Sequence, residues 1–242
     1  MRLDVYLTEK DIFPSRSKAR AAIESGSVTV NGKTEKPSFD VDGSEDIKIL
    51  AKDRFVSRAG EKLERALDEF DIDPRGMTVL DIGASTGGFT DCLLQRGARK
   101  VFALDVGSAQ LAEKLRNDER VIVIENFNAR YAKKENFHEE IDMIVMDVSF
   151  ISQTLIYEAC AHILSSGKRM ITLIKPQFEA GKKHIGKGGI VKDKDGSVLK
   201  EILQKLDNSA EEFGFERTAF TVSPIEGGDG NREYLGLFIR KE

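Results

Sequence analysis

The sequence predicts an α/β protein whose main part is a largely parallel β-sheet, preceded by a small α+β module. From residue 61 onward, near-continuous apolar segments alternate with segments of helical periodicity, which is typical of a parallel sheet covered on both faces. The last two apolar segments are joined by a short glycine-rich turn, which predicts an antiparallel hairpin. Residues 1–50, in contrast, contain only short elements.

The first 50 residues fit a small appended domain. A helix is predicted over residues 15–26, with Ser15 as its N-cap. A short strand at residues 28–30 precedes an Asn31-Gly32 turn signal, and residues 46–50 alternate as a further strand. So short a segment buries little apolar surface, so we expect it to accompany a larger domain. The expected boundaries are a domain at residues 1–50, a polar linker at 51–60 and a large domain at 61–242.

The large domain opens with a predicted helix over residues 61–70. Five predicted strands follow, separated by helical segments, at residues 77–83, 100–106, 121–125, 141–150 and 169–175. A helix over residues 198–213 then leads into the closing hairpin of residues 215–224 and 233–240. Five parallel strands with a terminal antiparallel hairpin are the pattern of the class I methyltransferase variant of the Rossmann-like, doubly wound fold.

Composition and charge exclude several classes of protein. A net charge of −4 with 40% hydrophobic residues fits an ordinary globular protein, and the two cysteines have no metal or disulfide spacing. The first residues lack the apolar core of a signal peptide, and no apolar run approaches 18 residues. We therefore expect a cytoplasmic protein. Its basic side chains gather locally, at residues 16–20 and 168–192, and either patch could meet a polyanion or be a solvated face.

A glycine-rich turn follows the first strand of the large domain, in the sequence DIGASTGGFT. Its glycine spacing is not that of a dinucleotide fingerprint, and an acid two residues before the first glycine suits a cationic ligand without phosphates, such as S-adenosylmethionine. Asp105 ends the next strand, where it can accept hydrogen bonds from ribose hydroxyls. Asn128 is the predicted adenine-edge contact, although a turn asparagine is often structural. The predicted cofactor residues are Asp81, Gly83, Ala84, Ser85, Thr86, Gly87, Gly88, Asp105, Val106, Asn128 and Asp147.

Four charged residues stand at element ends: Lys62, Asp147, Lys175 and Glu233. Parallel neighbouring strands place Asp147 and Lys175 at the carboxyl edge of the sheet, where open α/β sheets bind ligands. Each residue alone is explained as well by a surface ion pair, but four at one edge indicate chemistry. The segment around Asp147, DVSF, lacks the prolines that methyltransferases of exocyclic amines carry there, which disfavours an amino-group target.

The motifs then support a family resemblance. Residues 2–50 resemble the alpha-L RNA-binding motif, and residues 51–242 resemble the FtsJ-like 2′-O-ribose methyltransferases. FVSRAGEKL, DIGASTGGFTDCLLQRGA, DVSFIS, IKPQFE and GNREY, in this order, are similar to the TlyA (hemolysin A-like) family of rRNA methyltransferases. The resemblance implies 2′-O-methylation of a cytidine in 16S rRNA, with 23S rRNA as a further substrate in some relatives. It also implies that Lys62, Asp147, Lys175 and Glu233 form the catalytic tetrad.

The role of Lys175 has two alternatives. It could be the general base that removes the ribose 2′-proton, but with an ordinary lysine pKa of about 10.4 only roughly 1 in 2,500 side chains is neutral at pH 7. It could instead orient the hydroxyl and stabilise developing negative charge. RNA is expected to be bound by the small domain and by a loop at residues 181–189 that closes over the RNA backbone, although a plain disordered surface loop explains that sequence equally well. The predicted RNA-binding residues are Arg2, Arg16, Lys18, Arg20, Lys33, Lys182 and Lys183.

Two other functions compete with methyl transfer. A membrane-active hemolysin is one, although no secretion signal or membrane-spanning segment is present in the sequence. A non-catalytic RNA-binding factor in ribosome assembly is the other, and the four intact charged positions argue against it. The predicted partner is therefore rRNA within ribosomal subunits, with no membrane partner and no required metal.

Overall fold

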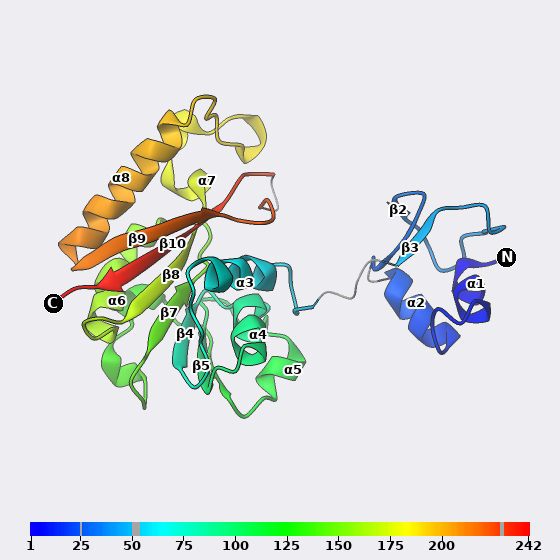
Figure 1. Ribbon diagram of the computed structural model, residues 1–242, viewed down its shortest axis with the longest axis horizontal. Coiled ribbons are helices and arrows are strands. Elements are labelled where there is room, and N and C mark those ends of the chain that lie inside the picture. Colours follow the sequence, from blue (N-terminus) through cyan, green and yellow to red (C-terminus); the bar gives the residue numbers. More distant parts are fainter. Residues whose placement is uncertain (25, 50–53, 228–229) are drawn as a thin grey trace. The chain divides into compact units, whose positions relative to one another are not determined.

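The computed structural model describes residues 1–24, 26–49, 54–227 and 230–242 of the chain. It contains two compact units, Met1–Arg54 and Phe55–Glu242 (Figure 1). We call them the small unit and the large unit.

The small unit packs two helices on a small antiparallel sheet. Helices α1 (Leu3–Glu9) and α2 (Arg16–Glu24) cover strands β1 (Val28–Val30), β2 (Lys33–Thr34) and β3 (Ile47–Ile49), in the order β2-β1-β3. The Ser15 hydroxyl accepts the Lys18 amide at 3.3 Å, as the predicted N-cap requires. Asn31 and Gly32 both have positive φ, 50° and 77°, which is the geometry of a tight hairpin turn. Leu3, Leu7 and Ile23 form the centre of this unit's core with Val28.

The large unit confirms the predicted methyltransferase-type sheet. Its strand order is β6-β5-β4-β7-β8-β10-β9, and β10 is antiparallel to both β8 and β9. The strands are β4 (Thr78–Ile82), β5 (Lys100–Leu104), β6 (Val121–Ile124), β7 (Met143–Met146), β8 (Arg169–Ile174), β9 (Phe215–Val222) and β10 (Tyr234–Arg240). The helices are α3 (Ala59–Glu69), α4 (Gly88–Gln95), α5 (Glu113–Arg116), α6 (Tyr157–Ile163), α7 (Pro176–Glu179) and α8 (Ser197–Glu212).

Helices cover both faces of this sheet, which is why its strands are continuously apolar. Residues from α3, α4 and α5 share one core with Val79 of β4, whereas residues from α6 and α8 share the opposite core with Leu80 (Figure 1). Side chains alternate along a strand, so Asp81 points to the same face as Val79, toward α4. The carboxyl ends of β4, β5, β7 and β8 therefore share one edge, bordered by α3 and α4.

The expected linker at residues 51–60 differs from the structure. Residues 51–53 lie outside the described residues, and Phe55 is buried in the core of the large unit. Gly60 lies in α3, where an added Cβ would come within 2.3 Å of the Phe55 ring. Helix α3 starts at Ala59. Residues 55–60 look polar in the sequence, but they belong to the large unit and pack within it.

Candidate active site

Lys175 and Asp147 form an ion pair at the carboxyl edge of the sheet. Asp147 follows β7 and Lys175 follows β8, and these strands are parallel neighbours. The Lys175 ammonium lies 2.5 Å from Asp147 Oδ1 and donates to the Ser149 hydroxyl at 2.8 Å. Both charged side chains are partly exposed, at 12% and 17%. The amine at this strand end is thus held in place and still open to a ligand.

Lys62 and Glu233 form a second, more buried pair. The Lys62 ammonium in the first turn of α3 lies 2.5 Å from Glu233 Oε2, and the two side chains are 11% and 3% exposed. Tyr234 pairs with Ile174 in the antiparallel register of β10 and β8. Continuing this register by one residue places Glu233 opposite Lys175. The structure therefore brings all four predicted tetrad residues to the same edge of the sheet.

Glycines of the DIGASTGGFT turn allow close approach between elements at this edge. A Cβ on Gly83 would lie 2.3 Å from the Asp147 carbonyl oxygen. Gly87 has a φ of 95° at the N-cap position of α4, and a Cβ on Gly88 would lie 2.4 Å from the Ser57 hydroxyl. Larger residues would push the turn away from β7 and from the segment before α3. The glycine pattern is thus explained by packing around the site.

Two adjoining cavities lie along this turn. A cavity of about 190 Å³ is polar and includes Lys175 and Asp147 in its wall. A cavity of about 450 Å³ is more apolar and extends past Asp105. Both are bordered by Gly83, Ser85, Asp147 and Ser149. The predicted Ala84, Thr86 and Gly88 line the smaller cavity, and the predicted Asp105, Val106 and Asn128 line the larger one. A separate hollow of about 640 Å³ beside Arg75 and Arg96 includes none of these residues.

Asp105 and Asn128 are held by backbone groups. The Asp105 carboxylate accepts the amides of Ser85 at 2.8 Å and Gly107 at 2.7 Å, one on each oxygen. A carboxylate oxygen has room for further donors, so Asp105 can still accept ligand hydroxyls. The Asn128 side chain accepts the Arg130 amide and caps a 3₁₀ turn. The structural reading of Asn128 thus holds, while its position on the cavity wall keeps the adenine-edge contact a prediction.

Asp81 and Gly87 do not line either cavity, although both were expected to bind the cofactor directly. Asp81 is fully buried and accepts the Thr90 hydroxyl at 2.6 Å, while its Oδ1 has no hydrogen-bond partner among the described residues. Burial, with the negative charge of Asp147 as a smaller cause, raises the pKa of Asp81 to about 7. A Cβ on Gly87 would meet Leu115 of α5 at 2.3 Å. Neither arrangement could be predicted from the sequence, because both depend on packing against helices.

The site also contains residues that the sequence analysis did not assign to it. Ser149 accepts from Lys175, and Ser57 lines the smaller cavity. Both lie inside motifs already recognised, DVSF and FVSRAG, which was the available signal. Glu179, 6% exposed, accepts the Ser152 hydroxyl at 2.6 Å and the Gln153 amide at 2.9 Å. It thereby fixes the segment that follows Asp147 to the segment that follows Lys175.

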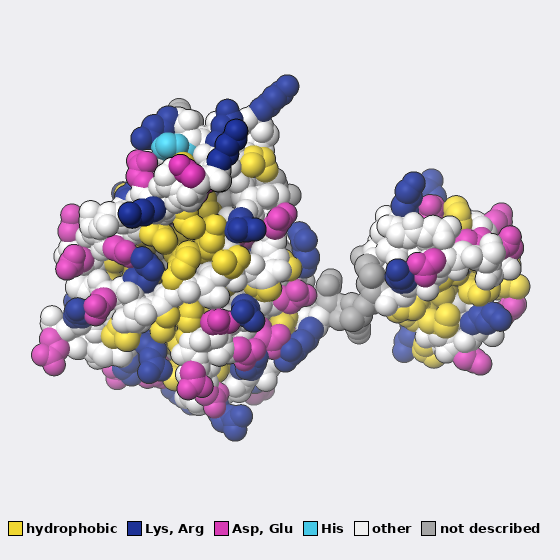
Figure 2. All heavy atoms as spheres, turned by 45° about the horizontal axis from the view of Figure 1, so that its top comes forward, with side chains coloured by type: hydrophobic (Ala, Val, Ile, Leu, Met, Phe, Trp, Pro, Cys, Tyr) yellow, Lys and Arg dark blue, Asp and Glu magenta, His cyan; other side chains and the backbone are white. Residues whose placement is uncertain are grey.

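Some of the predicted RNA-binding side chains form ion pairs, and others form none with the described residues. Arg2 and Arg16 both bind the buried Asp4, and Arg20 pairs with Glu24. Lys18 and Lys33 are exposed. In the large unit Lys183 pairs with Glu201, and the side chain of Lys182 lies outside what the structure describes. Figure 2 shows Lys and Arg side chains gathered on the large unit around the segment between α7 and α8.

Two further observations concern membranes and metals. None of the described helices combines the length and hydropathy needed to cross a membrane. Within the same described residues, His, Cys, Asp and Glu side chains do not gather in threes as metal ligands. The expectation that no metal is required stays a prediction.

The fold and the site define a class of protein, an FtsJ-like methyltransferase with an N-terminal S4 domain. The FtsJ-like methyltransferase family matches residues 55–240, and the S4 domain matches residues 1–47. Solved S-adenosylmethionine-dependent methyltransferases share the fold at low identity, such as one from Listeria monocytogenes with a TM-score of 0.54 and 18% identity.

Similarity over the full chain narrows this class. Hemolysin A of Brachyspira hyodysenteriae is 48% identical over 99% of this chain and 100% of its own. The 16S/23S rRNA (cytidine-2′-O)-methyltransferase TlyA of Mycobacterium tuberculosis is 38% identical over 100% of this chain and 90% of its own. A solved Streptococcus thermophilus structure that carries the hemolysin name covers 100% of this chain and 89% of its own, with a TM-score of 0.78 and 40% identity. The chain belongs to the TlyA, or hemolysin A-like, family of FtsJ-like methyltransferases.

Proposed function

We propose that this protein transfers a methyl group from S-adenosylmethionine to a ribose 2′-hydroxyl of rRNA, with a cytidine of 16S rRNA as the first candidate and 23S rRNA as a second. The observation that carries the proposal is the pair of lysine–carboxylate contacts, Lys175–Asp147 and Lys62–Glu233, at a sheet edge walled by glycines. The relatives named rRNA (cytidine-2′-O)-methyltransferase support the substrate. We place the reaction in the cytoplasm, on ribosomal subunits, without a metal.

The residues around the two cavities fit S-adenosylmethionine, which when bound supplies an electrophilic methyl group on a sulfonium. The larger cavity has an apolar wall of Leu104, Val106 and Phe127, which suits an adenine ring. Asp105, held by two backbone amides, would accept the ribose hydroxyls of the cofactor. The turn of residues 83–86 and Asp147 would surround its amino acid end. The absence of phosphates in this ligand agrees with the acids Asp105 and Asp147 in the walls beside the turn.

The tetrad has to hold a poorly acidic hydroxyl and stabilise charge as its oxygen attacks. In this step the 2′-oxygen forms a bond to the methyl carbon while the bond from that carbon to sulfur breaks with its electron pair left on sulfur, and the O–H bond of the ribose breaks. Lys175 carries an ammonium whose position is fixed by Asp147 and Ser149, so it can donate a hydrogen bond to the oxygen as negative charge develops. We propose this orienting role over general-base catalysis, with the proton passing to solvent. Lys62 and Glu233 form a second ion pair at the same sheet edge as Lys175, so their charges compensate each other.

The test is transfer of radiolabelled methyl from S-adenosylmethionine to purified 30S, 50S and 70S particles from a strain that lacks this modification. Lys175→Ala is compared with Lys168→Ala, a control at the other end of β8 whose partner is Asp142. We expect label at one alkali-resistant linkage of one rRNA, lost in Lys175→Ala and kept in Lys168→Ala. Cofactor binding without label on any particle would overturn the rRNA assignment. Label on a base rather than a ribose would overturn the reaction type.

A further inference from the structure

The basic segment between α7 and α8 folds into a small hairpin beside the tetrad. Ile185 and Val191 form an antiparallel bridge, the Gly186 amide donates to the Ile190 carbonyl at 2.7 Å, and the Lys192 amide donates to the His184 carbonyl at 2.9 Å. We call residues 184–192 the basic hairpin. It carries Lys187 and Lys192 with exposed side chains, and no described residue forms an ion pair with either. Two free ammonium groups on a formed hairpin suit a phosphate backbone.

Asn231 fastens this hairpin to the loop that carries Glu233. Its side chain is 3% exposed, donates from Nδ2 to the Gly189 carbonyl at 3.0 Å and accepts the Val191 amide on Oδ1 at 2.9 Å. One side chain thus satisfies a backbone acceptor and a backbone donor of the hairpin, and its amide orientation is determined by these two partners. Its own carbonyl accepts the Gly227 amide at 2.8 Å.

Glu233 is held within the same group of contacts. It lies two residues after Asn231, and its carbonyl accepts the Ser223 amide at 2.9 Å. A Cβ on Gly227 would lie 2.5 Å from Glu233 Oε1, so the backbone that bonds to Asn231 also packs directly on the carboxylate that pairs with Lys62. A shift of Asn231 would therefore also move the Gly227 backbone that packs on Glu233.

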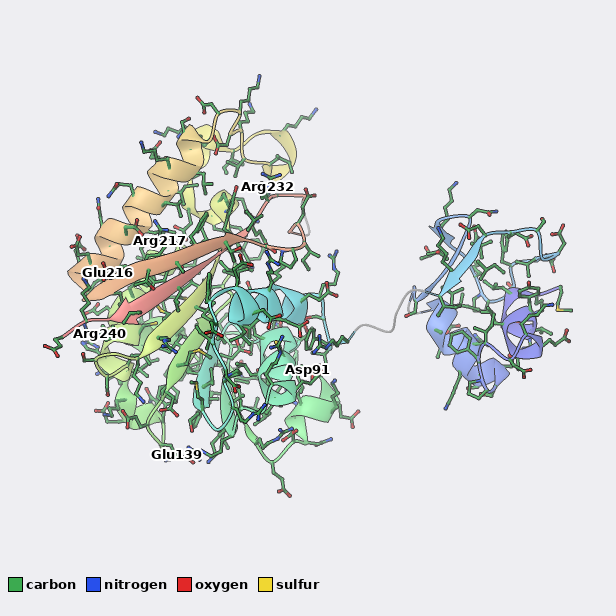
Figure 3. All side chains as sticks on the ribbon, viewed as in Figure 1. Asp91, Glu139, Glu216, Arg217, Arg232 and Arg240 are labelled. Carbon is green, nitrogen blue, oxygen red and sulfur yellow. The ribbon has the colours of Figure 1, made fainter. Side chains whose placement is uncertain are left out.

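A cavity of about 350 Å³ joins these parts. Its wall includes Ile190 and Val191 of the basic hairpin, Pro176 directly after Lys175, and Tyr234 directly after Glu233. Arg232, between Asn231 and Glu233, is exposed at the same cavity and is labelled in Figure 3. Arg232 therefore presents positive charge at this cavity, next to Glu233 in the chain, and Lys187 and Lys192 lie on the hairpin whose Ile190 and Val191 form part of the same wall.

We propose that Asn231 is a positioning residue that couples RNA held by the basic hairpin to the tetrad. Phosphates bound by Lys187, Lys192 and Arg232 would place the neighbouring ribose at Lys175, and Asn231 would keep the hairpin in register with Glu233 while they do so. Asn231 itself touches neither the RNA nor the reacting atoms. The inference rests on the proposed function, because it names how that reaction's substrate strand is held.

The test is a double-mutant cycle in the full-length protein. Asn231→Ala and the hairpin variant Lys187→Ala/Lys192→Ala are measured alone and together for kcat/KM on the methylated particle. Asn208→Ala, on the exposed face of α8, is the matched control. Each change of interest should cost about tenfold alone, and the combination should cost little more than either, because the lysines contribute only while Asn231 holds the hairpin. S-adenosylmethionine binding should be unchanged, since Asn231 lines neither cofactor cavity. Additive losses would overturn the coupling.

Amide hydrogen exchange separates this inference from the proposed function. Asn231→Ala should accelerate exchange of the Val191 amide about tenfold or more, while amides in β8 and β10 keep their protection. Unchanged Val191 exchange would overturn the inference even if the protein methylates rRNA. If the wild-type protein transfers no methyl group, the proposed function fails and positioning for it fails too, whereas the exchange result still decides whether Asn231 holds the hairpin.

Discussion

Asp4 in the small unit and Asp81 in the large unit are both buried aspartates, 1% and 0% exposed, but their surroundings differ. Asp4 contacts the guanidinium groups of Arg2 and Arg16 at 3.0 and 2.9 Å, and hydrogen bonds from these side chains lower the pKa of Asp4 to about 2. Asp81 accepts hydrogen bonds from Thr90 and forms no ion pair among the described residues, and burial raises the pKa of Asp81 to about 7. Burial alone therefore does not determine the charge of an acid; the number of cations beside it does.

Glu233 lies between these two cases, with one cation, Lys62. The comparison indicates different uses of charge in the two units. In the small unit, Arg2 and Arg16, which the sequence predicts to bind RNA, form ion pairs with Asp4. The sheet edge of the large unit keeps its acids with one cation or none, where a cationic ligand can interact with them. Variants that change the number of charges beside each acid test this difference between the two units.

The largest effect is expected where a single cation is removed from a buried acid. Lys62→Met leaves Glu233 at 3% exposure without a partner, which should lower the free energy of unfolding by about 3–5 kcal/mol and abolish methyl transfer. Lys175→Met leaves Asp147 at 17% exposure, so it should lose activity at a smaller stability cost. Chemical denaturation of both variants, beside the methyl-transfer assay, gives the comparison. Equal stability losses would show that burial does not distinguish the two pairs.

The next effect is expected at the acid with two cations. Asp4→Asn removes the carboxylate that joins Arg2 and Arg16, and because these arginines are 45% and 57% exposed, we expect a loss of only about 1–3 kcal/mol. A small unit has little stability to spare. Hydrogen exchange in the full chain should show Leu7 and Val28 amides losing protection while β4 keeps its own. The pKa of Asp4 is lowered, so in the wild type this contribution should disappear as the pH falls from about 4 toward 2.

Asp81, with no cation, should behave in the opposite sense. The pKa of Asp81 is raised on folding, so the folded state holds a proton that the unfolded state releases above about pH 4, and stability should fall as the pH rises from 4 to about 7. Asp81→Asn keeps an oxygen for the Thr90 hydroxyl and removes the titration. Its melting temperature relative to wild type should be higher at pH 8 than at pH 5. A pH-independent difference between the two proteins would contradict a raised pKa.

The smallest effect is expected at an exposed pair. Arg20 and Glu24 are 63% and 52% exposed, so Arg20→Ala should leave the free energy of unfolding almost unchanged. If Arg20 binds a phosphate, the same change should weaken particle binding and reduce the salt dependence of log Kd by about one unit. Binding measured at several salt concentrations tests this, with Arg65→Ala of the exposed Arg65–Glu69 pair as control. An unchanged salt slope would remove Arg20 from the RNA-binding residues.

Much of the fold could be predicted because its signals are local. Continuous apolar segments mark strands buried on both faces, and β4, β5, β6, β7 and β8 lie inside the ranges predicted for them. Glycines at a strand end mark a turn that must pass close to another element, as Gly83 does at Asp147. The sheet edge that carries Asp147 and Lys175 followed from strand ends alone. Their roles in catalysis and cofactor binding stay predictions.

From the sequence alone, therefore, one could determine where the strands lie along the chain, the family, and the sheet edge where charged residues gather. Which side chains contact one another depends on the tertiary structure. Lys62 and Glu233 are 171 residues apart in the chain, Asn231 joins a loop 40 residues away, and Arg2 and Arg16 meet at Asp4. Hydrophobic periodicity records which side of an element is buried. It does not indicate which charged side chains contact one another, because residues far apart in the chain come together only when the chain folds.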